Sequence, residues 1–231
     1  MPKEQRSPEE IESVRNNITE QALDLIVTEG FDGFSMRKLA NRLGIAAKTI
    51  YNYFHNKDEL YLYLLTRGFE ELLESFETAV KGDNKPIDQF KATVRAYVTF
   101  GLENANIYNL MFTWHVPKYN DYVDTPMEPA AHFELTTALK CAEFFMDRLQ
   151  DCLGDNVNAR EEDIRFEMIQ IWSQMHGYIA GINNTLLDYM HEKPMLLKNR
   201  VIDRIVKHSL SDLLELKYKT NSNVVSSHGE R

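Results

Sequence analysis

Apolar residues recur at every third or fourth position along most of the chain, which is the spacing of one face of an α-helix. Between residues 8 and 30 this spacing runs from Ile11 to Leu25, and it ends at Gly30. No segment bounded by turn residues alternates apolar and polar side chains, as a half-buried strand would. The pattern therefore predicts an all-α protein.

Capping residues and glycines mark the ends of the expected helices in the first part of the chain. Ser7 and Glu10 form a capping box with proline at the first helical position. Ser35 begins a short helix that ends at Gly44, and a second short helix is expected over residues 46–53. A capped helix then runs from Lys57 to about residue 81.

The rest of the chain is also expected to be helical, with an irregular connection over residues 115–129. The polar, aperiodic residues after 219 are expected to form a disordered tail. We therefore expect a three-helix head joined by the long helix to a C-terminal helical bundle. The expected division is a DNA-binding head in residues 1–56, a sensing and dimerisation domain in residues 57–219, and a tail in residues 220–231.

The net charge of −9 disfavours binding to nucleic acid, but this charge is unevenly distributed. Residues 58–231 carry all of it, whereas residues 33–57 contain five basic side chains and no Asp or Glu. A small basic surface on an acidic protein is typical of contact with phosphate at one end. A chance cluster on a solvated surface is the alternative.

Two short helices on either side of Gly44, with a helix before and a capped helix after, have the proportions of a helix-turn-helix unit. Such a unit places its second helix in the major groove of DNA. Ile50 and Phe54 would face the core, and the opposite side carries no acid. The candidates on that side are Ala47, Lys48, Thr49, Tyr51, Asn52 and Tyr53. Tyrosines that only cover the core are the structural alternative.

A series of short segments within residues 10–60 carries a specific resemblance. The segments are Gly30-Phe31, Ser35-Met36-Arg37-Lys38-Leu39-Ala40, Leu43-Gly44-Ile45, Thr49-Ile50-Tyr51-Asn52-Tyr53-Phe54 and Asn56-Lys57-Asp58-Glu59-Leu60. In this order and without a gap, they resemble the DNA-binding head of TetR-family transcriptional regulators.

The resemblance implies a DNA-contact role for certain matching positions. Phosphates or base edges would be contacted by Thr49, Tyr51, Tyr53 and Lys57. Arg37 would reach the adjacent backbone or groove edge, and Ser35 would cap its helix. Ala46 departs from the family pattern, in which serine often begins the recognition helix, so this helix lacks a side-chain cap. Tyr53 stands where many relatives have histidine.

TetR-family proteins use a variable C-terminal domain for ligand sensing and homodimerisation, and the resemblance implies the same for residues 57–219. Gly177, Ala180 and Gly181 form a small-residue face that would let a partner helix approach closely. The expected dimer interface consists of Gly177, Ala180, Gly181, Ile202, Val206 and Leu213. Trp172 with His176-Gly177 also resembles the Trp-His-Gly stretch of one C-terminal subclass.

Aromatic residues and methionines near the irregular connection are the candidates for a small-molecule site, since such sites are mostly apolar with a few polar groups. The candidates are Tyr108, Met111, Phe112, Trp114, His115, His132, Phe133, Phe144, Trp172, Met175 and His176. Packing in the core is the structural alternative for each of them.

The sequence therefore predicts a cytoplasmic transcriptional regulator, a repressor in the usual family mode. It would bind a palindromic double-stranded DNA operator as a homodimer and be released by a small hydrophobic effector. No catalytic motif, cofactor, metal site, signal peptide or membrane span is expected. The alternatives are an enzyme, a hydrophobe-binding protein without DNA binding, and an activator.

Overall fold

The structure is a computed structural model that describes residues 7–82, 85–154 and 161–211. These residues contain helices and no strand, so the predicted all-α class is confirmed. The expected tail in residues 220–231 lies outside the described residues.

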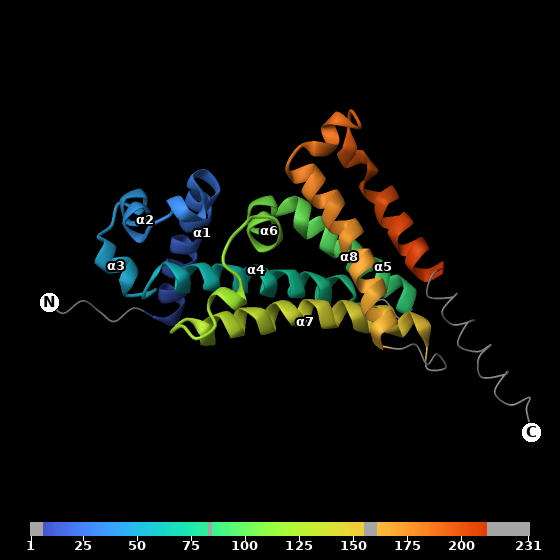
Figure 1. The fold of residues 1–231 in the computed structure, drawn as a ribbon, viewed down its shortest axis with the longest axis horizontal. Helices are drawn as coiled ribbons and strands as arrows, with labels where there is room; N and C mark the ends of the chain where they lie inside the picture. The colour runs from blue at the N-terminus through green and yellow to red at the C-terminus, as the bar shows by residue number, and fades with distance from the viewer. Residues whose placement is uncertain (1–6, 83–84, 155–160, 212–231) are drawn as a thin grey trace, which may run out of the picture. The chain divides into compact units, whose positions relative to one another are not determined.

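The chain divides into two compact units. Unit 1 comprises residues 1–68 and 106–137, and unit 2 comprises residues 69–105 and 138–231. Two long helices, α4 (Lys57–Ala79) and α7 (Glu128–Leu153), contribute residues to both units (Figure 1). The division expected at residue 57 stays a prediction.

Unit 1 begins with the three helices of the head, drawn in blue in Figure 1. These are α1 (Pro8–Gly33), α2 (Met36–Leu43) and α3 (Ala47–Tyr51). The first turns of α4 follow them. The unit also contains α6 (Ala105–Phe112) from residue 106 on, a 3₁₀ turn η1 (Tyr119–Asp121) and the start of α7.

The caps predicted for the head are present. Ser7 accepts a hydrogen bond from the Glu10 backbone N–H at 3.2 Å, and the Glu10 carboxylate accepts one from the Ser7 N–H at 2.8 Å. Ser35 accepts from the Lys38 N–H at 3.3 Å. Gly44 ends α2 with φ 65°, in the left-handed region that favours glycine.

Buried side chains from α1, α2 and α3, and from the residues just after α3, form the core of the head. Among them are Ile18, Ala22, Leu39, Ile50 and Phe54. The inward orientation predicted for Ile50 and Phe54 is therefore confirmed.

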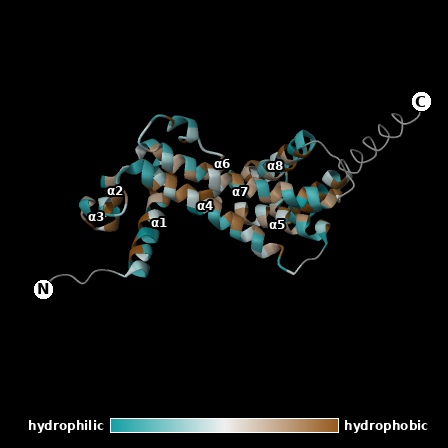
Figure 2. Ribbon diagram, turned by 90° about the horizontal axis from the view of Figure 1, so that it is seen from below, coloured by the Kyte–Doolittle hydropathy of each residue, from teal (hydrophilic) through white to brown (hydrophobic). Residues whose placement is uncertain are grey.

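Unit 2 contains the second part of α4, α5 (Pro86–Glu103), the second part of α7 and α8 (Glu161–Asn183). Two 3₁₀ turns, η2 (Leu186–Tyr189) and η3 (Pro194–Leu197), follow α8, and residues 198–211 are helical. Figure 2 shows hydrophobic and hydrophilic residues mixed along each helix, as amphipathic helices require.

Hydrogen bonds between α5 and α8 reinforce the apolar core of unit 2. The Trp172 indole N–H donates to the Tyr97 hydroxyl at 2.8 Å, and the Asn183 amide donates to the Gly101 carbonyl at 2.9 Å. Among the described helices, none has an apolar stretch sufficient to cross a membrane.

Replacing Gly44 tests how much the turn between α2 and α3 depends on its left-handed backbone. We expect Gly44→Ala to lower the free energy of unfolding by about 1 kcal/mol, because a Cβ atom is strained at positive φ. Gly44→Asn is the matched control, since asparagine tolerates this conformation and should cost less. Urea unfolding followed by circular dichroism measures both, and an equal loss in the two variants would contradict the strain argument.

Candidate nucleic-acid interface

The turn at Gly44 sets where α3 begins, and the buried side chain of Ile50 sets which side of α3 faces outward. α3 has only five residues and, as predicted, Ala46 supplies no side-chain hydrogen bond to its first turn. Backbone N–H groups at that end therefore remain available to water or to an anion.

The outward side of α3 carries the residues proposed to contact DNA. Lys48, Tyr51 and Asn52 are exposed, whereas Ala47, Thr49 and Tyr53 are half-buried. On α2, Arg37 is exposed and Ser35 is half-buried at the cap. Within the described part of the chain, no hydrogen bond or ion pair engages the side chain of Arg37 or Lys48. These two cations are thus free to meet phosphate or base edges.

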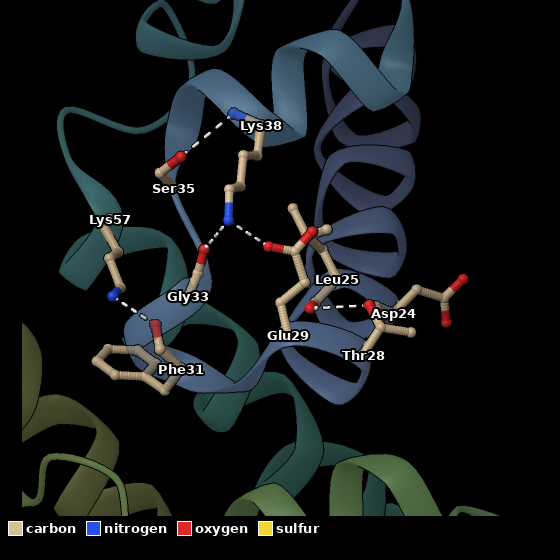
Figure 3. A network of polar contacts seen from close by, with 9 residues as sticks. All are labelled: Asp24, Leu25, Thr28, Glu29, Phe31, Gly33, Ser35, Lys38 and Lys57. Carbon is tan, nitrogen blue, oxygen red and sulfur yellow. Dashed lines mark hydrogen bonds and ion pairs between the residues drawn. The ribbon is translucent and has the colours of Figure 1, made fainter.

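Two other basic side chains of the head are instead paired with acids of α1. The Lys38 ammonium contacts the Glu29 carboxylate and donates to the Gly33 carbonyl at 2.8 Å (Figure 3). The Arg42 guanidinium donates to Asp24 at 3.2 Å. The charge count over residues 33–57 missed these pairs, because both acids precede that segment in the sequence. The basic surface is therefore smaller than the count indicates.

Lys57 has a structural contact in addition to its proposed DNA contact. Its ammonium donates to the Phe31 carbonyl at 2.6 Å and lies 3.9 Å from the centre of the Phe31 ring (Figure 3). Gly30, with φ 75°, interrupts α1 just before this carbonyl. Lys57 thereby joins the first turn of α4 to the end of α1.

The first turns of α4 are also held by the connection after α6. The Tyr122 hydroxyl donates to the Asp58 carboxylate at 3.1 Å, and the Tyr61 hydroxyl donates to the Pro117 carbonyl at 3.0 Å. Burial raises the pKa of Tyr122, and the negative charge of Asp58 raises it further, so this phenol stays a neutral donor. The sequence predicts only an irregular connection here, and Tyr122 is the residue that could have indicated its anchoring role.

The residues expected to bind a small molecule are distributed over both units. Seven of them lie in unit 1, and the other four, which include Phe144, lie in unit 2. Tyr108 and Met111 are buried, whereas His115, His132 and Phe133 are exposed.

In unit 2, the candidate rings of Trp172 and His176 stack at 4.8 Å between their centres. Burial lowers the pKa of His176, which favours its neutral form. Met175 lies in the core. None of the candidates lines the groove of about 870 Å³ that lies between α4 and α5.

The residues expected at a dimer interface also differ in exposure. Gly177 is exposed, and a Cβ atom there would have no neighbour within 4 Å. Gly181 is buried against Leu187 of its own chain, and Ile202 and Val206 lie in the core of unit 2. Ala180 is half-buried, and Leu213 lies outside the described residues. Of the described residues in this set, Gly177 is thus the one most accessible to a partner.

α1, α2 and α3 have the arrangement of a helix-turn-helix DNA-binding protein. Gly44 forms the turn between α2 and α3, and α3 is short and contains no acidic residue. Comparison with known families supports the same class. Residues 18–64 match the family described as "Bacterial regulatory proteins, tetR family", and residues 90–195 match "Tetracyclin repressor-like, C-terminal domain". The chain belongs to the TetR family of transcriptional regulators.

Individual relatives agree with this family. The chain is 28% identical to the HTH-type transcriptional activator FasR of Mycolicibacterium smegmatis over 123 residues. The aligned region covers 53% of this chain and 53% of that protein. The match thus spans about half the length of that relative. A TetR-family regulator from Rhodococcus RHA1 has a TM-score of 0.65 at 14% identity, covering 84% of this chain and 95% of that one.

A TetR-family regulator from Bordetella parapertussis has a TM-score of 0.62 at 18% identity, covering 84% of this chain and 94% of that one. At such identities the likeness of the two solved structures concerns the fold. The possible membership in the Trp-His-Gly subclass stays a prediction.

Replacing Lys57 separates its structural contact from its proposed DNA contact. We expect Lys57→Met to lower the free energy of unfolding by about 1 kcal/mol, because the variant loses a hydrogen bond from a charged donor. Lys48→Met is the matched control, since Lys48 is exposed and has no such contact, and its stability should change by less than about 0.5 kcal/mol. Urea unfolding tests this difference, and equal stability of the two variants would contradict the structural role.

Proposed function

We propose that the protein is a ligand-responsive repressor of the cytoplasm that binds a palindromic operator as a homodimer. A small hydrophobic effector releases it from DNA. The observation that carries the proposal is the outward side of α3, where Lys48 is unpaired and Tyr51 and Asn52 are exposed beside no acid. Such a surface fits the major groove, which presents hydrogen-bonding base edges between two rows of phosphates.

The proposed contacts divide into those that position the protein and those that read sequence. Arg37, Tyr51 and Lys57 are suited to phosphates, because each carries a donor at the edge of the acid-free surface. Lys48 and Thr49 are suited to base edges, because they lie on the outward side of α3. A change at a base contact costs about 1–3 kcal/mol and alters the preferred sequence.

Exposed apolar residues of unit 2 support self-association. On α8, Phe166 and Ile169 are 56% and 57% exposed, and Gly177 offers an open approach on the same helix. Beyond α8, Tyr189 and Met190 are 90% and 83% exposed. Apolar surface of this kind on a folded unit marks an interaction site.

The turns after α8 are held firmly although their apolar side chains face solvent. Leu187 packs against Gly181, and the Tyr178 hydroxyl donates to the Pro194 carbonyl at 3.0 Å. The exposure of Tyr189 and Met190 therefore belongs to an anchored segment. We include these turns with the exposed residues of α8 in the proposed dimer surface, in place of Gly181, Ile202 and Val206.

α4 is the element through which an effector would act, because its residues contribute to both units. A dimer must hold its two recognition helices about 34 Å apart to enter successive major grooves. A ligand that prefers a different setting of α4 shifts the population away from this spacing. Shifting the population from 1:99 to 99:1 requires a preference of about 10⁴-fold.

Activation of transcription is the second candidate, since the relative from Mycolicibacterium smegmatis is described as an activator. Both functions use the same DNA contacts. The position of the bound site relative to the promoter distinguishes them, because a repressor site overlaps the promoter and an activator site lies upstream.

An electrophoretic shift assay tests the DNA-binding part of the proposal. We expect the purified chain to shift a fragment from its own promoter region in the presence of excess unrelated DNA. Lys48→Ala should weaken specific binding, whereas Glu77→Gln, an exposed change on α4 outside the head, should leave it unchanged. The proposal fails if the wild-type chain binds the promoter fragment no better than the competitor.

Sedimentation velocity tests the proposed dimer surface. We expect Phe166→Glu with Ile169→Glu to shift the protein toward monomer, because four charges would be buried in a two-fold interface. Ile87→Glu is the control, since Ile87 is 50% exposed on α5. If the double variant keeps its helical circular dichroism and stays dimeric, α8 does not form the interface.

A further inference from the structure

A groove lies wholly within unit 2, between the second part of α4 and α5. Its volume of about 870 Å³ is within the range of small-molecule sites, roughly 300–1,000 Å³. Small and apolar side chains line much of it. They are Ser75, Thr78 and Ala79 of α4, and Ala92, Ala96 and Phe100 of α5. Apart from Phe100, these side chains are short, and the two helices therefore leave space between them.

Four acidic and two basic side chains line the same groove. Glu71 and Glu74 come from α4, and Asp88 and Glu103 come from α5. In the part of the chain that the structure describes, no side-chain hydrogen bond or ion pair engages Glu74, Asp88 or Glu103. Their charges are therefore available to a ligand.

The two basic residues of the groove are held by the helical residues 198–211. The Lys91 ammonium lies 2.7 Å from the Asp203 carboxylate, and the Arg95 guanidinium donates to the Asn199 side-chain carbonyl at 2.9 Å. Neither Asp203 nor Asn199 lines the groove. With Lys91 neutralised by Asp203, the three carboxylates of Glu74, Asp88 and Glu103 outnumber the one remaining basic side chain, Arg95, among the described residues that line the groove.

We propose that the groove between α4 and α5 binds an organic cation with an apolar body. The short apolar side chains would bury the body, and the carboxylates of Glu74 and Glu103 would attract the positive charge. The acids are spread over two helices, and among the described residues no group of three or more His, Cys, Asp or Glu could hold a metal ion. This spacing suits a bulky organic ion better than a metal ion.

The inference deepens the proposed function and rests on it for one point, that a bound ligand affects DNA binding. α4 carries one wall of the groove at residues 71–79 and begins with Lys57, which contacts the end of α1. A cation in the groove therefore contacts the same helix that carries a proposed phosphate contact at its first residue.

Two probes of nearly the same shape and opposite charge test the inference. Tetraphenylphosphonium is a lipophilic cation, and tetraphenylborate is its anionic counterpart. Isothermal titration calorimetry with the full-length chain should detect binding of the cation and much weaker binding of the anion. Binding of the cation should weaken as salt is added, because the carboxylates are accessible to solvent.

A pair of matched variants locates the site. Glu74→Gln with Glu103→Gln removes two carboxylates from the groove, and should weaken binding of the cation by about two- to fivefold for each. Glu70→Gln with Glu77→Gln removes two exposed carboxylates of α4 outside the groove, and should leave binding unchanged. Both variants change the net charge equally, so a difference between them reports the groove. Ala96→Trp should block binding by filling the groove, with circular dichroism as the check on folding.

Three results would each overturn the inference. They are no binding of the cation, equal binding of the two probes, and an equal loss of binding in both carboxylate variants. The shift assay is read separately. A chain that binds its promoter DNA but not the cation retains the proposed function and loses this site. A chain that binds the cation in the groove but no DNA retains the site and loses the proposed function.

Discussion

The proposed DNA-contact surface depends on the burial of Ile50 and Phe54 in the core of the head. A helix of five residues is too short to be stable alone, because nucleation of a helix is costly and few hydrogen bonds repay it. α3 therefore takes its position from the contacts of its inward side chains. Because Ile50 is fixed inward, Lys48, Thr49 and Tyr51 are placed around the remaining sides.

The head was largely predictable because its signals are local. Serine caps act three residues away, a left-handed turn needs glycine at one position, and helical spacing separates inward from outward residues. Ser35, Gly44 and Ile50 each follow such a rule and lie where the sequence predicts. The same rules correctly indicate that Ala46 cannot cap α3.

The partners of the basic residues were not predictable, because they depend on how helices pack. Lys38 meets Glu29 and Arg42 meets Asp24 only once α1 and α2 are folded together. Lys57 meets a carbonyl that the break at Gly30 leaves accessible. A count of charges along the sequence cannot distinguish such paired cations from free ones such as Lys48.

The ligand candidates were chosen by residue type, and residue type does not determine which side chains share a space. Aromatic residues and methionines such as Tyr108 and Met175 fill the cores of both units. The groove in unit 2 exists for the opposite reason, since alanine, serine and threonine leave room between α4 and α5. Short side chains give no distinctive pattern in a sequence, so this space is visible only in the fold.

The stacked pair of Trp172 and His176 gives unit 2 its own optical signal. The chain has two tryptophans, and the other one, Trp114, belongs to unit 1. Each unit therefore contains a single indole, and a change in the emission of either one can be assigned after replacing the other with phenylalanine. Because burial lowers the pKa of His176, the ring that stacks on Trp172 favours its neutral form. Indole fluorescence of the two single-tryptophan variants can thus follow the two units separately without an attached label.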